Sequence, residues 1–262
     1  MTSTFAVREN GRVTVRVLLL GGTTEARQLA ATLVGDPRVH VVSSLAGRVR
    51  APQLPEGEVR VGGFGGVEGL VCWVRAERID AIVDATHAFA RQITSAAVQA
   101  CSGVGLPLLL LRRAEWLPGP GDDWRSVRSL PAAAALLPEL GERVFLTSGR
   151  QEVAAFAALD RLWFLVRSVD PPDPPVPART QVLLDRGPFT VAGEMALLRE
   201  HRIDVLVTKN SGGAMTCAKL EAARRLGLPV VMVSRPPEPD IPRVSTAVEA
   251  QRWVEALVRH RG

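Results

Sequence analysis

The chain has 262 residues, of which 47% are hydrophobic and 23% are charged, so it is long enough to bury one large core or two smaller ones. Its net charge is +5, but the arginines are spread along the chain and form no basic arm, which argues against a nucleic-acid-binding protein. No apolar run approaches the ~20 residues of a membrane helix, and residues 1–15 lack the apolar core of a signal peptide. We therefore expect a cytoplasmic protein with no nucleic-acid or membrane partner.

The arginines and cysteines narrow the choice of ligands. Guanidinium groups match the geometry of carboxylates, so dispersed arginines suit an acidic small molecule. A bias of the coding sequence explains them equally well, since only Lys209 and Lys219 are lysines. The three cysteines, Cys72, Cys101 and Cys217, are odd in number and far apart, so they fit neither a disulfide framework nor a zinc cluster. We expect free thiols and no metal site.

The first half of the chain alternates short apolar runs with segments of helical periodicity. Val15–Leu20 is typical of a buried parallel strand, and Thr24–Leu33 has its apolar residues at helical spacing. This alternation predicts βαβ units and a parallel sheet. Further strands are expected at 39–42, 59–61, 79–85 and 106–111, and further helices at 67–77 and from 86 to about 102.

The second half repeats this pattern at an offset of 122 to 127 residues. A period this long indicates a duplicated domain rather than a solenoid. The matching segments are 16–23 with 143–150, 78–83 with 202–207, and 104–109 with 226–231, while residues 163–169 match the second strand.

We therefore predict an α/β protein of two similar Rossmann-like parallel-sheet domains, with a ligand cleft between the carboxyl ends of the two sheets. A Pro- and Gly-rich stretch at 116–123 is the candidate boundary, and a second Pro-rich loop spans 170–177. Exchange of a strand between the similar halves stays open, as does the oligomeric state. The expected parts are an irregular leader over 1–14, a dinucleotide-binding domain over 15–120 and a substrate domain over 121–262.

A glycine turn joins the first strand to the first helix. Gly21 and Gly22 would let the backbone approach a pyrophosphate, which the amino end of the helix would attract through its N–H groups and dipole. Thr23 or Thr24 would cap the helix or donate a hydroxyl to a phosphate, and Glu25 completes this part of the predicted cofactor site. The full G-x-G-x-x-G pattern is missing, so a capped helix after a tight turn is the alternative.

The end of the second strand indicates which cofactor would bind. An NAD site usually has an acid there, which holds the ribose 2′-OH. This chain has Ser43, Ser44 and Arg48 instead, which would accept a 2′-phosphate and so favour NADPH. The alternative is that the two serines only begin a turn.

Two further loops of the first half follow strands. The glycine-rich segment 62–66 contributes Gly63 and Phe64 to the predicted cofactor site, and Thr86 is assigned to it as well. His87 is a candidate catalytic residue because it follows the carboxyl end of a strand. A hydrogen-bonded structural histidine is the alternative.

The corresponding loops of the second half carry the predicted substrate site. Lys209 is a lysine in a chain dominated by arginine, so we expect it to bind substrate or act in catalysis rather than to be a solvated surface cation. Under the alternative, Asn210 and Ser211 would only cap the next helix. The predicted substrate-binding residues are Ser148, Gly149, Arg150, Lys209, Asn210 and Ser211.

Six segments together resemble the signature of the precorrin-6A reductase family, and the resemblance runs from about Arg16 to the carboxyl end. It implies reduction by NADPH of one ring double bond of precorrin-6A, an acidic tetrapyrrole, to give precorrin-6B in cobalamin biosynthesis. Ala88 stands where many relatives are expected to have proline, which would shift only a local turn. The segments are VLLLGGTTEAR (17–27), SSLAGR (43–48), GGFGGVEG (62–69), DATHAF (84–89), TSGR (147–150) and TKNSGG (208–213).

Two other classes of protein are alternatives to the family that these segments resemble. A short-chain dehydrogenase of the usual kind needs a catalytic tyrosine, and the chain has no tyrosine. A non-enzymatic clamp for a nucleotide or small ligand would share the paired α/β domains, because a fold does not determine a function. Such a clamp would leave NADPH fluorescence unchanged on mixing.

Overall fold

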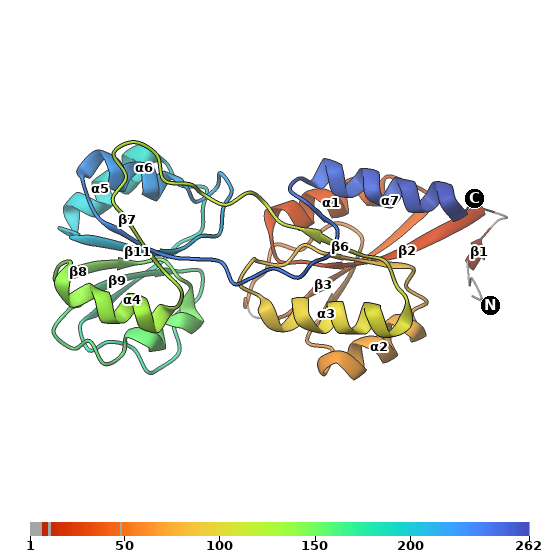
Figure 1. The fold of residues 1–262 in the computed structure, drawn as a ribbon, viewed down its shortest axis with the longest axis horizontal. Coiled ribbons are helices and arrows are strands. Elements are labelled where there is room, and N and C mark those ends of the chain that lie inside the picture. Colours follow the sequence, from red (N-terminus) through yellow and green to blue (C-terminus); the bar gives the residue numbers. More distant parts are fainter. Residues whose placement is uncertain (1–6, 10–11, 48, 262) are drawn as a thin grey trace. The chain divides into compact units, whose positions relative to one another are not determined.

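The computed structural model describes residues 7–9, 12–47 and 49–261. The chain forms two compact units, of which the first consists of Met1–Arg113 with Pro237–Gly262 and the second of Ala114–Pro236. Each unit contains a parallel sheet with helices on both faces (Figure 1). None of the helices in the described ranges is both long enough and apolar enough to cross a membrane.

The first unit alternates strands and helices along the chain. Its elements are β1 (Val7–Glu9), β2 (Arg12–Leu20), α1 (Thr24–Val34), β3 (Val39–Leu45), β4 (Glu58–Val61), α2 (Gly66–Ala76), β5 (Ala81–Asp84), α3 (Arg91–Val104), β6 (Leu108–Leu111), β13 (Arg243–Val244) and α7 (Ala247–Arg261). The sheet has the order β13-β6-β5-β2-β3-β4 with parallel neighbours, and β1 pairs antiparallel with β2.

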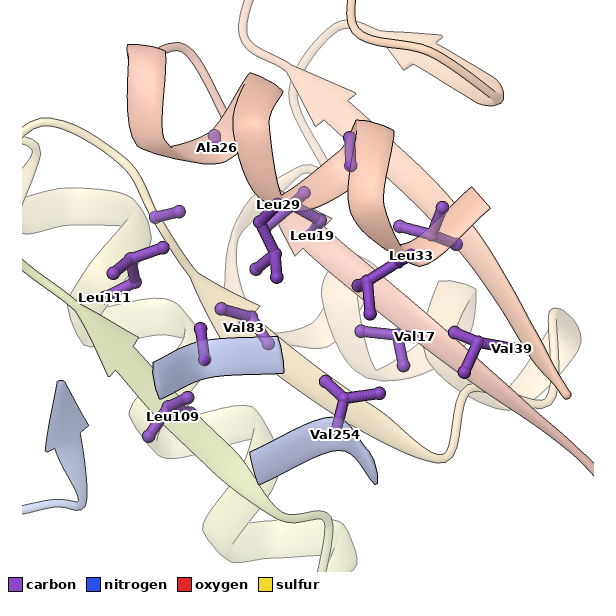
Figure 2. Packing of buried hydrophobic residues seen from close by; sticks show 14 of the residues in the cluster. Val17, Leu19, Ala26, Leu29, Leu33, Val39, Val83, Leu109, Leu111 and Val254 are labelled. Carbon is purple, nitrogen blue, oxygen red and sulfur yellow. The ribbon is translucent and has the colours of Figure 1, made fainter. Parts of the chain in front are cut away.

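The core of the first unit lies on both faces of β2, because successive side chains of a strand point to opposite faces. Leu19 packs beside Leu29 of α1, in a cluster to which α7 contributes Val254 (Figure 2). Leu18 points to the other face, where α2 and α3 cover it. Full burial of one such side chain stabilises the fold by about 1.5–3 kcal/mol. The alternating apolar run of β2 therefore fixes the layers that hold the carboxyl ends of the strands in place.

The second unit follows the same plan. Its elements are β7 (Trp124–Val127), α4 (Leu130–Leu136), the short 3₁₀ helix η1 (Leu137–Glu139), β8 (Arg143–Leu146), the 3₁₀ helix η2 (Arg150–Phe156), β9 (Trp163–Ser168), β10 (Thr180–Leu184), α5 (Val191–Glu200), β11 (Val205–Lys209), α6 (Ala218–Leu226) and β12 (Val230–Val233). The sheet has the order β10-β9-β8-β11-β12-β7, and its neighbours are parallel. In Figure 1, α5 and α6 cover one face of this sheet and α4 covers the other.

Local details of the backbone confirm the duplication. Arg78 and Arg202 occupy matching positions before β5 and β11, and they are the non-glycine residues with positive φ in the described part of the chain, at 52° and 48°. Two residues further on, Asp80 and Asp204 each accept a main-chain N–H from the first strand of their own repeat, at 2.7 and 2.8 Å. The two halves are therefore alike in conformation as well as in sequence pattern.

The last strand of each repeat is exchanged between the units. The order β4-β3-β2-β5-β6 in the first sheet corresponds to β10-β9-β8-β11-β12 in the second. β7 follows β6 along the chain but pairs with β12, and β13 follows β12 but pairs with β6. The helix after each exchanged strand stays with it, since α4 contacts β7 and β12 while α7 contacts α1 and β2. The strand exchange that the sequence left open is present.

The boundaries between the units differ from those predicted. The first unit ends at Arg113 rather than at residue 120, and residues 237–262 belong to it rather than to the second unit. The physical reason is that α7 buries Ala250, Val254 and Val258 in the core of the first unit. β1 and the start of β2 also lie within the segment 1–14 that was expected to be irregular. The cleft expected between the domains stays a prediction.

The strand positions were predicted more accurately than the strand ends. The strand expected from 106 begins at Leu108, and the strand in the matching segment 226–231 begins at Val230. Each is preceded by a proline, Pro107 or Pro229, which has no N–H to donate to a neighbouring strand. β7, β10 and β13 were not predicted as strands.

Candidate functional site

The glycine turn of the first unit lies between β2 and α1, as predicted. Gly22 is exposed and has a φ of 114°, a conformation that requires glycine. Thr23 caps α1, because its hydroxyl accepts the N–H of Ala26 at 3.1 Å and donates to the carbonyl of Ala85 at 2.8 Å. The Thr23 hydroxyl therefore serves the cap and the link to β5. The amino end of α1 keeps the dipole that attracts a phosphate.

The two residues after the cap have polar partners of their own. The Thr24 hydroxyl accepts a bond from Arg27 at 3.1 Å. Glu25 forms an ion pair of 3.3 Å with Arg113, which follows β6. Glu25 thus joins the first turn of α1 to the carboxyl end of another strand, and Gly21 is held by its N–H bond to the carbonyl of Ser44 at 2.9 Å.

The serines at the end of β3 lie where the dinucleotide prediction placed them. Ser43 is buried, and its hydroxyl has no hydrogen-bond partner among the described residues. The Ser44 hydroxyl accepts a bond of 3.0 Å from Arg60 of β4. Arg48 lies outside the described residues. An orphaned buried hydroxyl is costly in a folded protein, so Ser43 is a candidate to meet a bound ligand.

The glycine-rich loop after β4 forms the next part of the same edge. Gly62, Gly65 and Gly66 have positive φ values of 122°, 82° and 86°. Gly63 does not, and a Cβ built on it meets no atom within 4 Å. Its lack of a side chain is therefore explained neither by backbone conformation nor by packing among the described residues, which leaves room for a ligand.

Phe64 of this loop packs against a cation. The guanidinium of Arg60 lies over the Phe64 ring at 3.9 Å, and Trp73 of α2 meets Phe64 edge-on at 5.4 Å between centroids. Gly69 keeps α2 close to the loop, because a Cβ there would collide with the carbonyl of Phe64. The loop is thus fixed by α2 on one side and by Arg60 on the other.

A buried ion pair holds the loop after β5. Asp84 is completely buried and pairs with Arg112 at 3.0 Å. Asp84 also accepts the hydroxyls of Thr86 and Thr94 at 2.7 and 2.6 Å, and Arg112 donates to the carbonyl of Thr86 at 2.8 Å. Burying a charge is tolerated when it is paired and hydrogen-bonded in this way. Because the Thr86 side chain is part of this network, the network also fixes the position of the next residue, His87.

His87 is half-buried in the same loop. Its Nδ1 accepts the N–H of Phe89 at 3.3 Å, and the two rings lie 5.6 Å apart. In the neutral ring this bond places the proton on Nε2. Whether His87 donates a proton to substrate stays a prediction.

The predicted residues of the second unit gather at the ends of β8 and β11. Ser148 is buried, and its hydroxyl has no hydrogen-bond partner in the described part of the chain. Lys209 ends β11, and its ammonium pairs with Glu152 of η2 at 2.8 Å. Arg150, which follows Gly149, lies 3.6 Å from the carboxylate of Asp173. Two cations and an orphaned hydroxyl thus share one edge of the second sheet.

The next two residues support the main chain around them. The side-chain amide of Asn210 accepts the N–H of Trp116 at 2.9 Å and donates to its carbonyl at 3.0 Å. Arg235 donates to the carbonyls of Asn210 and Ser211 at 2.9 and 3.1 Å. These contacts favour a structural role for Asn210, while its predicted contact with substrate is untested.

Three residues of these clusters were missed in the sequence. Arg60 lies inside an edge strand, Arg112 follows an apolar strand, and Glu152 lies in an irregular helix, so no local pattern distinguishes them.

Burial lowers the pKa of Arg60, whereas it raises the pKa of the Cys101 thiol to about 12 and so makes that thiol unreactive. Among the described residues, no three His, Cys, Asp or Glu side chains are grouped to hold a metal ion.

Comparison with known proteins places the chain in a family. The family of precorrin-6x reductase CbiJ/CobK matches residues 16–255. The precorrin-6A reductase of Rhodococcus erythropolis is 59% identical over 93% of this chain and 99% of that protein, and that of Mycobacterium tuberculosis is 54% identical over 92% and 98%. A solved structure of CobK precorrin-6A reductase is 43% identical, with a TM-score of 0.86 over 93% of this chain and 97% of that one. The chain therefore belongs to the precorrin-6x reductase CbiJ/CobK family of oxidoreductases.

Proposed function

We propose that the protein is a precorrin-6A reductase, which uses NADPH to reduce one double bond of the precorrin-6A ring and gives precorrin-6B in cobalamin biosynthesis. The observation that carries this proposal is the identity of 59% across 99% of the length of the Rhodococcus erythropolis precorrin-6A reductase. The family assignment does not support the alternative of a non-enzymatic clamp.

The carboxyl edge of the first sheet suits NADPH. Support comes from the helix α1 with its capped amino end, from the orphaned hydroxyl of Ser43, and from the open space at Gly63. No acid ends β3, so the usual partner of a ribose 2′-OH is missing from this strand. The absence of that carboxylate removes a repulsion that would disfavour a 2′-phosphate.

We assign the substrate to the carboxyl edge of the second sheet. Precorrin-6A carries acetate and propionate arms, which a cation can bind through charge-assisted hydrogen bonds. Lys209 would orient one such carboxylate, with Arg150 and the Ser148 hydroxyl as further donors. Bound NADPH supplies the hydride, and reduction also needs a proton on the neighbouring carbon. His87 Nε2 is our candidate for that proton.

The test is a turnover assay with the purified protein, precorrin-6A and either NADPH or NADH. We expect NADPH to be oxidised only when precorrin-6A is present, with one equivalent of a product two hydrogens heavier by mass spectrometry. A protein that binds NADPH but leaves precorrin-6A unchanged would contradict the proposed reaction. Equal rates with NADH would contradict the proposed cofactor.

A further inference from the structure

Arg60 has an uncompensated positive charge. It is half-buried, and burial lowers its pKa. Among the described residues no carboxylate lies within ion-pair distance of it, whereas Arg112 and Lys209 each have an acidic partner. A partly desolvated cation without a counterion is unfavourable, so this position suits a bound anion.

The hydrogen bonds of Arg60 fix its guanidinium at the edge of the predicted cofactor site. One terminal nitrogen donates to the Ser44 hydroxyl at 3.0 Å and to the carbonyl of Gly62 at 2.8 Å, and the other donates to the carbonyl of Gly63 at 3.1 Å. A guanidinium has more N–H donors than these three bonds use. In the described part of the chain, the Nε–H of Arg60 and one terminal N–H have no partner, so they are available to an anion.

The flat face of the guanidinium is also arranged for a nucleotide. One face lies on the Phe64 ring at 3.9 Å, so the side chain is held in one plane. Planar stacking together with bidentate donation to a phosphate is the combination that distinguishes arginine from lysine. We propose that Arg60 binds the 2′-phosphate of NADPH and determines the preference for NADPH over NADH. This inference rests on the proposed function and names a specificity residue for it.

Two variants separate reading of the phosphate from support of the loop. Arg60→Met keeps an apolar stem against Phe64 but removes the charge, and Arg60→Lys keeps the charge but loses the planar fork. Arg75→Met on the exposed end of α2 is the control for the loss of one positive charge. Circular dichroism and the thermal midpoint check that each variant is folded.

The measurement is the dissociation constant of each protein for NADPH and NADH by fluorescence, and for 2′,5′-ADP and AMP by calorimetry. We expect Arg60→Met to lower the affinity for NADPH and 2′,5′-ADP by about tenfold or more, while the affinity for NADH and AMP changes less than about threefold. Arg60→Lys should be intermediate, and Arg75→Met should match the unaltered protein.

The outcomes distinguish this inference from the proposed function. If the unaltered protein does not prefer NADPH, the proposed cofactor is wrong. If it does prefer NADPH, but Arg60→Met lowers the affinity for NADPH and NADH equally or lowers neither affinity, then Arg60 only supports the loop and the inference is overturned. Should Arg60→Met fail to fold, Arg60→Lys decides, because an unchanged ratio of the two affinities in that variant would equally overturn it.

Discussion

The two units share one scaffold, but the ends of their corresponding strands differ. Ser43 of β3 lies beside β2, and Val166 of β9 occupies the corresponding position beside β8. The residue that follows is Ser44 in the first unit and Arg167 in the second. In the second unit, Arg167 is buried and pairs with both oxygens of Glu194. The first unit therefore has small polar residues at a position where the second has a bulky, neutralised ion pair.

The turns that follow β2 and β8 also differ, and this difference too favours a dinucleotide in the first unit. In the first unit, Gly21 and Gly22 lead into α1, an α-helix of 11 residues with a capped amino end. In the second, Ser148 and Gly149 lead into η2, a 3₁₀ helix of 7 residues without a side-chain cap. Aligned peptide dipoles and free N–H groups at a helix start favour a phosphate, and the first unit offers both more fully. These differences support the proposal that the dinucleotide binds to the first unit.

The largest effect is expected from breaking the ion pair of the second unit. Glu194→Ala would leave the buried Arg167 without a counterion, and loss of one partner of a buried pair costs about 3–5 kcal/mol. Denaturant unfolding measures this. Glu221→Ala, which removes a partly exposed partner of Arg224 and Arg225, should cost less than about 1 kcal/mol. If both variants lowered the free energy of unfolding by similarly small amounts, the ion pair of Arg167 and Glu194 would not be an essential part of the core of the second unit.

Gly63→Val tests the open space of the first unit. Neither the backbone at Gly63 nor its packing disfavours a side chain, so the variant should fold normally. Its affinity for NADPH should fall by about a hundredfold, because the valine side chain would occupy the space of the cofactor. Gly22 is a poorer target, since its positive φ disfavours valine in any case. The control is Gly103→Val, at another exposed glycine without close neighbours. Normal NADPH binding by the Gly63 variant would refute this part of the cofactor site.

Lys209→Ala tests the role of the second unit. The variant should raise KM for precorrin-6A by about tenfold and leave the affinity for NADPH nearly unchanged, because a charge-assisted contact to a substrate carboxylate is lost. Steady-state kinetics and NADPH fluorescence give both values. Glu152→Gln, which keeps Lys209 but weakens its ion pair, is the matched variant. A fall in kcat alone would show that Lys209 acts in the chemical step, and a loss of NADPH affinity would place its loop in the cofactor site.

The smallest effect concerns the loop before the exchanged strand β7. The hydrogen bond from Arg224, followed by that from the N–H of Gly119, holds the pKa of Asp122 below its usual value of 3.8. A lowered folded-state pKa stabilises the fold above the unfolded pKa, and this stabilisation is lost as the pH falls through the folded pKa. Asp122→Asn should therefore cost about 1 kcal/mol or less at neutral pH and nothing in strong acid. A cost that does not change with pH would show that the ionised carboxylate is not responsible.

The layers and the duplication could be predicted from the sequence because they depend on local patterns. Val17–Leu20 is apolar on both faces, and the repeated segments at 78–83 and 202–207 begin with matching turns, in which Arg78 and Arg202 have φ values of 52° and 48°. The exchanged strands could not be predicted. β13 has only two residues, and its partner β6 precedes it by more than a hundred positions, so no local pattern indicates the pairing.

The candidate site was predicted where it depends on motifs and missed where it depends on pairing. Gly21 and Gly22 directly follow β2, and Ser43 lies near the carboxyl end of β3, so all three lie at the expected edge. Arg60 and Glu152 acquire their significance only from residues brought to them by the fold, namely Ser44 and Lys209.

The most direct test of the claim that only the first unit binds a dinucleotide is a calorimetric titration of the protein with NADPH. We expect one NADPH per chain, with binding strongly weakened in Gly63→Val and preserved in Lys209→Ala. Two NADPH per chain, or one site that survives Gly63→Val and disappears in Lys209→Ala, would contradict this claim.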